Sequence, residues 1–366
     1  MKVTAALSPA TGKPFEIDEV DLEEPRFDEV LVKISATGLC HTDLLFKDHL
    51  PIPIPAVFGH EGAGIVEKVG QGVTTVKPGD HVALSFNYCG KCSRCLAGMP
   101  YYCENNFILN YSGARADGSM PISKGGMPVF GCFFGQSSFA TYSLATERNL
   151  VKVPHDVPLE ILGPLGCGIQ TGAGTVMNAL KAETGSSIVV FGTGAVGLSA
   201  VMAAKVIGCT TIIGVDIKPG RLELAKKFGA THVVNPAEKN SVEEIRGITG
   251  LGVNYAVETT GSPAVYRQAV ESLAAHGRCA LLGASPPGTE VSFDMNTLLT
   301  DGKGTFGVIE GEAIPQVFIP KLIALYKQGL FPFDQLIKLY DMKDINQAVH
   351  DSEAGGTIKP VIRFNS

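Results

Sequence analysis

The sequence predicts an α/β protein that combines a β-rich domain with a domain built on a doubly wound parallel sheet. Three observations support this fold class. The length of 366 residues corresponds to about two domains of ordinary size. In the first 160 residues the apolar segments are short and are separated by Gly and Pro. From residue 187 onward strand-like and helical segments alternate, which is typical of parallel sheets whose strands are connected by helices.

The β-rich first part contains several short strand-like segments. We expect strands at residues 29–36, 62–69 and 80–84. The turn Lys77-Pro78-Gly79-Asp80 separates the last two of them. Because long amphipathic helical patterns are scarce here, this part is predicted to be a barrel or sandwich with loops.

The second part alternates between strands and helices. We expect helices at residues 195–207, 221–228, 242–248 and 263–274. We expect strands at residues 188–191, 211–216, 232–235, 254–258 and 278–283. After about residue 305 one more helix, 315–327, and a last strand, 357–364, are expected.

Composition and charge exclude several classes of protein. Apolar residues make up 45% of the chain and charged residues 18%, which excludes a disordered chain. The net charge of −6 provides no field that would attract nucleic acid or an anionic membrane. Two uncharged stretches, 161–180 and 186–204, are rich in Gly, Ser and Thr, so we do not expect them to span a membrane. Because the first residues lack a signal or transit-peptide pattern, we expect a soluble cytoplasmic protein.

A glycine-rich motif predicts a dinucleotide site. Gly192-Thr193-Gly194-Ala195-Val196-Gly197 matches GxGxxG and lies between the expected strand 188–191 and the helix 195–207. In this setting Gly192, Gly194 and Gly197 allow a tight turn and close approach of the backbone to a pyrophosphate. The start of the helix, at Ala195 and Val196, offers free N–H groups to the phosphates. The alternative is a glycine-rich turn that binds nothing.

An acidic residue in the second part predicts which dinucleotide binds. Asp216 lies 216 − 197 = 19 residues after Gly197, at the end of the next expected strand. A carboxylate there bonds the ribose 2′-OH and repels a 2′-phosphate, so NAD is favoured over NADP. Lys218 and Arg221 follow closely. We expect them on the adenosine rim, where they could soften this preference.

Nine cysteines in a chain of this length favour metal binding or catalysis over a disulfide framework. Cys89, Cys92, Cys95 and Cys103 lie within fifteen residues of one another, in a lobe of about residues 86–104. Four sulfurs complete the tetrahedral coordination of zinc and leave no open position, so this site is predicted to be structural. Reduced thiols in a loop, or an iron–sulfur cluster, remain as alternatives.

A second set of metal-ligand residue types is dispersed along the chain. Cys40 follows the expected strand 29–36, His60 precedes the strand 62–69, and Cys167 lies near the change of pattern at residue 168. Two thiolates and one imidazole would leave a fourth zinc position open for water or substrate. By spacing alone, residues placed like Cys40 and Cys167 are more often core cysteines, and one placed like His60 is more often a turn histidine with its hydrogen bonds satisfied.

Taken together, these motifs resemble the zinc-containing medium-chain alcohol dehydrogenases along nearly the whole chain. The matching segments, in the family's order, are Cys40-His41-Thr42-Asp43, Gly59-His60-Glu61-Gly62-Ala63-Gly64, the four-cysteine lobe, Gly166-Cys167-Gly168, and the glycine-rich motif with Asp216. The resemblance implies a GroES-like catalytic domain at residues 1–168 and 309–366, and a Rossmann domain at 169–308. It also implies NAD, a structural zinc in the lobe, and a catalytic zinc on Cys40, His60 and Cys167.

The resemblance assigns catalytic roles around this second zinc. Thr42 matches a hydroxyl that bonds the substrate oxygen and passes its proton onward, and Asp43 matches a carboxylate that orients His60. Glu61 matches an acid behind the zinc with Lys359 as its basic partner, although the two could form an ordinary structural ion pair. Lys359 and Thr171 also fall among the expected cofactor-binding positions.

One position departs from the family pattern. Leu45 stands where many members carry the histidine that ends the proton relay. His41 matches a pyrophosphate contact and could also serve as a base. We therefore predict a relay assisted by water.

The substrate is predicted from the expected pocket walls. These fall at Ser85, Phe86, Ile108, Phe133, Phe134 and Ile309. Together with segment 112–135, which resembles that of aryl and allylic alcohol enzymes, they favour primary aromatic (benzyl-type) or allylic alcohols. The Phe residues could instead be plain core. The alternatives are a short-chain aliphatic alcohol or polyol, and hydroxymethylglutathione, whose branch carries Arg where this chain has Phe107. A non-catalytic protein that binds NAD or zinc is a further alternative.

Three cysteines remain outside both metal sets. Cys209 and Cys279 lie beside apolar segments and are expected to be buried and inert, whereas Cys132 is expected to border the substrate channel. Beyond a small-molecule alcohol or aldehyde, the resemblance implies a homodimer or homotetramer paired through roughly residues 291–308.

Overall fold

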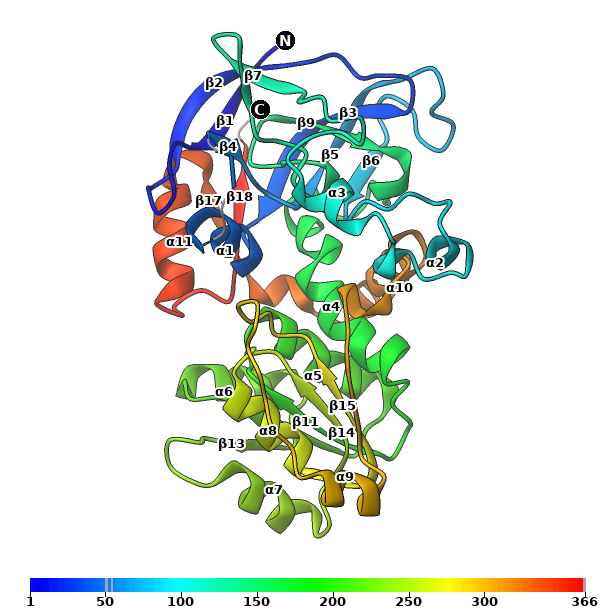
Figure 1. Cartoon of the computed structure of the whole chain (residues 1–366), viewed down its shortest axis with the longest axis vertical. Coiled ribbons are helices and arrows are strands. Elements are labelled where there is room, and N and C mark those ends of the chain that lie inside the picture. Colours follow the sequence, from blue (N-terminus) through cyan, green and yellow to red (C-terminus); the bar gives the residue numbers. More distant parts are fainter. Residues whose placement is uncertain (50–51, 54, 365–366) are drawn as a thin grey trace. The chain divides into compact units, whose positions relative to one another are not determined.

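The structure is a computed structural model that describes residues 1–49, 52–53 and 55–364. The chain forms two compact units. The first contains Met1–Cys167, Ile314–Leu322 and Asp334–Ser366, and the second contains Gly168–Ala313 and Ile323–Phe333. Figure 1 shows the chain in sequence colours, with the later segments of the first unit in orange and red.

The first unit is rich in β-structure, as predicted. Its strands are β1 (Lys2–Ser8), β2 (Glu16–Leu22), β3 (Glu29–Gly38), β4 (Ala56–Val57), β5 (Glu61–Val69), β6 (His81–Leu84), β7 (Ile122–Lys124), β8 (Met127–Val129), β9 (Tyr142–Thr146), β10 (Leu150–Lys152), β17 (Ile337–Asp341) and β18 (Lys359–Arg363). In the described part of the chain they form one sheet in the order β4-β1-β2-β7-β8 and another in the order β10-β6-β5-β3-β18-β17, with β9 also paired to β3. The last strand of the chain, β18, thus lies beside β3, a strand near the start of the chain.

Helices in the first unit are short. They are α1 (His41–His49), α2 (Ser93–Leu96), α3 (Asn106–Tyr111) and α11 (Ile345–Glu353), and α10 (Pro315–Lys327) begins in this unit. The core contains many buried aromatic rings, among them Phe58, Phe130, Phe133 and Phe139. Because aromatic side chains bury a large apolar area each, this cluster is a main source of stability for the unit.

The second unit carries the predicted parallel sheet. Its strands are β11 (Ser187–Phe191), β12 (Thr211–Val215), β13 (His232–Val234), β14 (Val253–Glu258), β15 (Leu273–Leu281) and β16 (Gly304–Gly307). They lie in the order β13-β12-β11-β14-β15-β16, and all of their pairings are parallel. The order reverses at β11, which is the switch point where doubly wound folds bind ligands. The predicted α/β fold class is confirmed.

Helices connect these parallel strands. The connecting helices are α5 (Ala195–Ile207), α6 (Pro219–Phe228), α7 (Ser241–Thr249), α8 (Pro263–Glu271) and α9 (Met295–Asp301), whereas α4 (Gly168–Gly174) precedes β11. Sequence chemistry explains where α7 begins, since the Asn240 side chain accepts hydrogen bonds from the N–H groups of Val242 and Glu243 and so caps this helix.

The predicted boundary between α8 and β15 is wrong. The helix expected to reach residue 274 ends at Glu271, and Leu273 and Ala274 begin β15. The segment contains Leu and two Ala, which favour helix locally. Pairing of Leu273 with Val253 of β14 outweighs that preference.

The uncharged stretches 161–180 and 186–204 consist of short helical turns and of a strand followed by a helix. Within the described residues, none of the helices has the length and apolar character needed to cross a membrane.

Candidate active site

The structure brings Cys40, His60 and Cys167 together in the first unit. Their ligand atoms, with a carboxylate oxygen of Glu61, all lie within 4.8 Å of one another. Cys40 lies between β3 and α1, and His60 immediately precedes β5. Because β3 and β5 are antiparallel and pair Gly38 with Glu61, they present these two side chains at one end of the sheet.

Cys167 reaches this cluster by a tight packing of backbone. It follows the 3₁₀ turn η5 (Gly163–Gly166), which lies directly against β5. A Cβ atom on Gly163 would lie 2.1 Å from the backbone oxygen of Glu61. Only glycine permits that approach, so the sequence of the turn places the third ligand.

The hydrogen bonds of His60 fit a metal ligand. Nδ1–H of this fully buried imidazole donates to Oδ1 of Asp43 at 2.8 Å. Its Nε2 atom is also buried and has no hydrogen-bond partner among the described residues. A buried acceptor without a partner is costly unless a ligand occupies its lone pair. The donor set and the free Nε2 therefore fit zinc, with Asp43 fixing the imidazole as metal-bound histidines usually require.

The charges around the cluster favour the thiolate form of Cys40. The hydrogen bond with Cys167 and the positive charge of Lys359 hold the pKa of the Cys40 thiol well below its usual value, against the opposing effect of burial. The thiolate is the form that ligates metals. Nζ of Lys359 lies 2.7 Å from the Glu61 carboxylate, and both side chains are buried. This ion pair neutralises Glu61 next to the thiols. The predicted partnership of the two residues is thus present.

The residues expected to handle the substrate proton lie on α1. Oγ1 of Thr42 is 3.8 Å from Sγ of Cys40, which places this hydroxyl beside the ligand cluster. His41 begins the helix and is exposed, whereas Leu45, one turn later, is half-buried.

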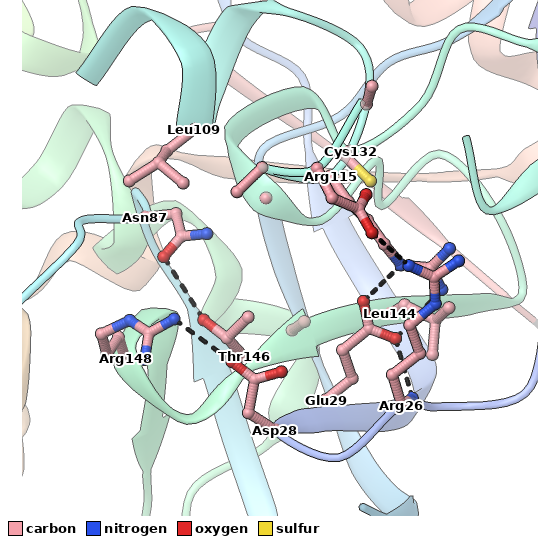
Figure 2. A pocket seen from close by; sticks show the side chains of 15 residues that line it. Arg26, Asp28, Glu29, Asn87, Leu109, Arg115, Cys132, Leu144, Thr146 and Arg148 are labelled. Atoms are coloured by element: carbon pink, nitrogen blue, oxygen red, sulfur yellow. Dashed lines mark hydrogen bonds and ion pairs between the residues drawn. The ribbon is translucent and has the colours of Figure 1, made fainter. Parts of the chain in front are cut away.

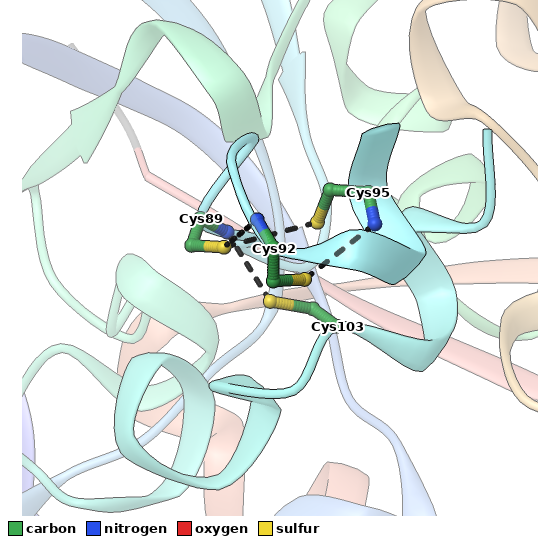
Figure 3. Close-up of side chains that lie close together, drawn as sticks. All are labelled: Cys89, Cys92, Cys95 and Cys103. Carbon is green, nitrogen blue, oxygen red and sulfur yellow. Dashed lines mark hydrogen bonds between the residues drawn. The ribbon is translucent and has the colours of Figure 1, made fainter. Parts of the chain in front are cut away.

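The four-cysteine lobe closes on itself as predicted (Figure 3). The sulfur atoms of Cys89, Cys92, Cys95 and Cys103 lie within 4.8 Å of one another, and those of Cys89 and Cys95 are 4.0 Å apart. Zinc–sulfur bonds of about 2.3 Å in a tetrahedron require sulfurs about 3.8 Å apart. Burial raises the pKa of the Cys89 thiol, but hydrogen bonds from the N–H groups of Lys91 and Cys92 outweigh this effect and lower it to about 6. The geometry fits a closed zinc site.

The glycine-rich motif lies in the second unit, between β11 and α5. Gly192 adopts the left-handed conformation with φ 84°, and a Cβ atom on Gly197 would lie 1.8 Å from the Gly192 oxygen. These two glycines therefore shape the turn. Gly194 differs, since a Cβ there would meet nothing nearer than Nη1 of Arg221 at 3.9 Å. The open space at the start of α5 fits a phosphate group.

Asp216 lies beside this motif at the end of β12. Its Oδ2 atom accepts hydrogen bonds from the N–H of Thr193 at 2.8 Å and its hydroxyl at 3.1 Å. Its Oδ1 atom accepts the N–H of Lys218, and Nη1 of Arg221 lies 3.8 Å from the carboxylate. The acid, the two basic residues and the glycine turn are therefore brought together. Thr171, on α4 in the same unit, donates to Glu310 at 3.5 Å.

Comparison with known proteins shows the family of this chain. Residues 26–155 match the alcohol dehydrogenase GroES-like domain, and residues 195–328 match the zinc-binding dehydrogenase domain. The chain is 43% identical over 362 residues to the geraniol dehydrogenase of Castellaniella defragrans, covering 98% of this chain and 97% of that protein. It is 35% identical over 378 residues to the S-(hydroxymethyl)glutathione dehydrogenase of Paracoccus denitrificans, covering 100% of both. The crystal structure of benzyl alcohol dehydrogenase from Acinetobacter calcoaceticus matches with a TM-score of 0.97 and 52% identity, covering 100% of both chains.

The chain belongs to the zinc-containing medium-chain alcohol dehydrogenases. The predicted family is confirmed. The chain is therefore a zinc-dependent alcohol oxidoreductase that uses NAD, and its substrate is a small alcohol or aldehyde.

In this alcohol dehydrogenase the expected pocket residues differ in their surroundings. Phe133 and Phe134 are buried against the His60 ring, with centroid distances of 5.6 and 4.4 Å. The buried Ser85 hydroxyl donates to the Gly166 oxygen at 2.6 Å, and Phe86 is buried in the aromatic core. Ile108 is half exposed on α3, at 49%, and Ile309 lies in the second unit with 47% exposure. The structure thus brings the two Phe residues into contact with a predicted zinc ligand.

Sequence reasoning missed Gln136. This buried side chain donates to the backbone oxygens of His60 at 2.9 Å and Ser85 at 3.2 Å, and it accepts the N–H of Gly62 at 3.1 Å. No local motif marks it, because its partners lie 51 to 76 residues away in the sequence.

A cavity of about 250 Å³ in the first unit was also not predicted (Figure 2). Arg115 and Cys132 both line this cavity, and Nε of Arg115 lies 2.6 Å from the carboxylate of Glu29. Burial raises the pKa of the Cys132 thiol to about 12, which makes it a poor nucleophile. Cys209 and Cys279 are buried, as expected.

Proposed function

We propose that this alcohol dehydrogenase oxidises primary aromatic (benzyl-type) or allylic alcohols to aldehydes, with NAD as the hydride acceptor. One observation carries the proposal most directly, namely that the candidate zinc ligand His60 is flanked by the aromatic rings of Phe133 and Phe134. Relatives that act on geraniol and on benzyl alcohol support the same substrate class, since both are activated primary alcohols.

The residues of the first unit would hold the metal and move the proton. Cys40, His60 and Cys167 would ligate zinc, which supplies Lewis acidity toward the alcohol oxygen when bound. Thr42, beside Cys40, would accept the alcohol proton in its hydroxyl hydrogen bond and pass it onward. The hydrocarbon side chain of Leu45 cannot carry a proton. The route onward therefore uses water, with His41 exposed at the start of the same helix.

The residues of the second unit would hold the cofactor. The turn at Gly192 and Gly194 would receive the pyrophosphate at the start of α5, and Asp216 would accept the ribose 2′-OH. Lys218 and Arg221 would lie at the adenosine rim, and His41, Thr171 and Lys359 remain proposed cofactor contacts. The reaction balances as alcohol plus NAD⁺ giving aldehyde, NADH and one proton.

The cellular setting is also proposed from the family. We expect a cytoplasmic homodimer or homotetramer. The strand β16 supports pairing between copies because it lies at an edge of the parallel sheet, and pairing would cover that edge.

A substrate panel tests the proposed function. Metal analysis should find two zinc ions per chain, and kcat/KM with NAD should be higher for benzyl alcohol or geraniol than for ethanol or hydroxymethylglutathione. A preference for ethanol would refute the substrate class, and a preference for hydroxymethylglutathione would assign the chain to that branch. NAD binding without alcohol-dependent NADH formation would refute enzymatic function altogether.

A further inference from the structure

We propose that the turn formed by residues 132–138 is a clamp that positions the His60 imidazole, with Phe134 and Gln136 as its positioning residues. The inference rests on the proposed function, because it concerns the same zinc site. It assigns to Phe134 a role in holding a metal ligand rather than only in lining a substrate pocket.

The first support is the contact between rings. Phe134 stacks on the His60 imidazole with a centroid distance of 4.4 Å and an interplanar angle of 23°, and Phe133 meets the same ring edge-on at 81°. The bond from Nδ1 to Asp43 restrains one atom of the imidazole, but it leaves the ring free to tilt about that atom. A stacked face blocks such a tilt. The two restraints together therefore fix the direction of the Nε2 lone pair.

The second support is the hold of the same turn on the His60 backbone. Gln136 donates to the His60 oxygen at 2.9 Å and accepts the Gly62 N–H at 3.1 Å, so it spans the ligand on both sides. The N–H of Ser138 donates to the Gly59 oxygen at 2.9 Å. Residues before, at and after His60 are thus each bound to this one turn.

The third support is the backbone conformation of the turn. Cys132, Phe134 and Ser137 have φ values of 52°, 52° and 53°, in the left-handed region that residues other than glycine rarely adopt. Such strain persists where the surroundings determine the conformation strongly, and it concentrates at functional sites. Here hydrogen bonds hold it, since the Ser137 hydroxyl accepts the Phe133 N–H at 2.9 Å and donates to the Val57 oxygen at 2.7 Å.

Zinc release tests the clamp without relying on activity. In the purified enzyme, transfer of zinc to a chromophoric chelator should show one phase for the Cys/His cluster and one for the four-cysteine lobe, which serves as an internal reference. Phe134→Leu should accelerate the first phase roughly tenfold, the lower end of the effect of removing support from a metal ligand. The lobe phase should not change. Gln136→Met, which removes the side-chain hydrogen bonds at similar volume, should accelerate the same phase.

A matched control separates the clamp from ordinary packing. Phe130 is equally buried in the same aromatic cluster and contacts Phe58, but no ring contact joins it to His60 in the described structure. Phe130→Leu should therefore leave both release phases as in the wild type. If Phe134→Leu behaves like Phe130→Leu, the clamp is refuted and Phe134 is ordinary core.

Two further outcomes are decisive. Phe134→Tyr retains the aromatic face and should release zinc as the wild type does, and Gln136→Met carries the test if Phe134→Leu does not fold. Equal acceleration in the Tyr and Leu variants would overturn the stacking role. A wild-type enzyme that holds only the lobe zinc would refute the proposed function itself, whereas two zinc ions with unaltered release in the variants would refute only the clamp.

Discussion

The carboxylate of Asp43 joins two zinc-ligand segments, because one oxygen accepts Nδ1–H of His60 at 2.8 Å and the other accepts the N–H of Cys40 at 3.0 Å. The first oxygen also accepts the Gly59 N–H at 3.1 Å. Asp43 and His60 are both fully buried, so solvent does not compete for these bonds. The geometry of two proposed ligands thus depends on one acidic side chain on α1.

Asp43→Asn should therefore weaken zinc binding at the Cys/His cluster. An amide keeps the size of the side chain but loses the charge that favours the Nδ1–H tautomer and raises the basicity of Nε2. We expect a 10- to 100-fold loss of affinity for the catalytic zinc, as is typical for such partners. Competition with a chromophoric chelator measures it. Asp48→Asn on the same helix should have no such effect, and equal losses in both variants would contradict the assigned role.

The Asp216 carboxylate should determine the choice of dinucleotide. Asp216→Asn keeps an oxygen for the Thr193 N–H but removes the charge that repels a 2′-phosphate. We expect KM for NAD to rise about tenfold, the cost of one weakened hydrogen bond to a charged group. KM for NADP should fall, because Arg221 lies only 3.8 Å from the carboxylate and would then face the phosphate. Steady-state kinetics with both cofactors measure this. Glu223→Ala on α6 is the control and should leave the ratio of the two KM values unchanged. The same unchanged ratio in Asp216→Asn would contradict the prediction.

Stability below neutral pH should depend on a pair of histidines in the first unit. The His81 and His155 rings lie 4.0 Å apart, and Nδ1 of His81 is buried without a partner among the described residues. Burial, and then a positive charge on His155, lower the pKa of His81 below its usual value. The unfolded chain therefore takes up the proton first, so stability is complete above about pH 6.5 and falls as the pH drops below it.

Urea denaturation at pH 7.5 and pH 5.5 measures this dependence. His155→Gln removes the like charge and should reduce the loss of stability at pH 5.5, whereas His350→Gln, at an exposed position, should leave it as in the wild type. Identical pH dependence in all three proteins would show that the pair does not control stability.

The sequence predicts best what depends on nearby residues. The four cysteines of the lobe and the strand, turn and helix around Gly192 are recognisable because the residues that form each site are close in the chain. Cys40, His60 and Cys167 are assigned only through the family resemblance, since the pairing of β3 with β5 and the η5 turn bring them together. The helix end near Ala274 is mispredicted because strand pairing outweighs local propensity.

Gln136 and the stacking of Phe134 on His60 have no sequence signature at all. A buried amide and a buried aromatic ring satisfy the same composition rules whether they support a metal ligand or an ordinary core. Only their three-dimensional contacts distinguish the two cases.

The approach of η5 to β5 should control whether the third ligand reaches the cluster. In Gly163→Ala the new Cβ would lie 2.1 Å from the backbone oxygen of Glu61, so the turn η5 or the strand β5 must shift. Because Cys167 follows this turn and His60 precedes Glu61, we expect loss of the catalytic zinc and a stability cost of about 1–3 kcal/mol, as for other overpacked sites. Zinc content and urea denaturation measure both effects.

The same substitution elsewhere provides the control. Gly247 lies inside α7, where a Cβ would meet nothing within 4 Å. Gly247→Ala should stabilise the protein by about 0.5–1 kcal/mol, because alanine loses less conformational entropy in a helix, and it should retain both zinc ions. If Gly163→Ala also retains both, close packing of η5 on β5 is not what places Cys167, and the ligand must be held by its neighbours after residue 167 instead.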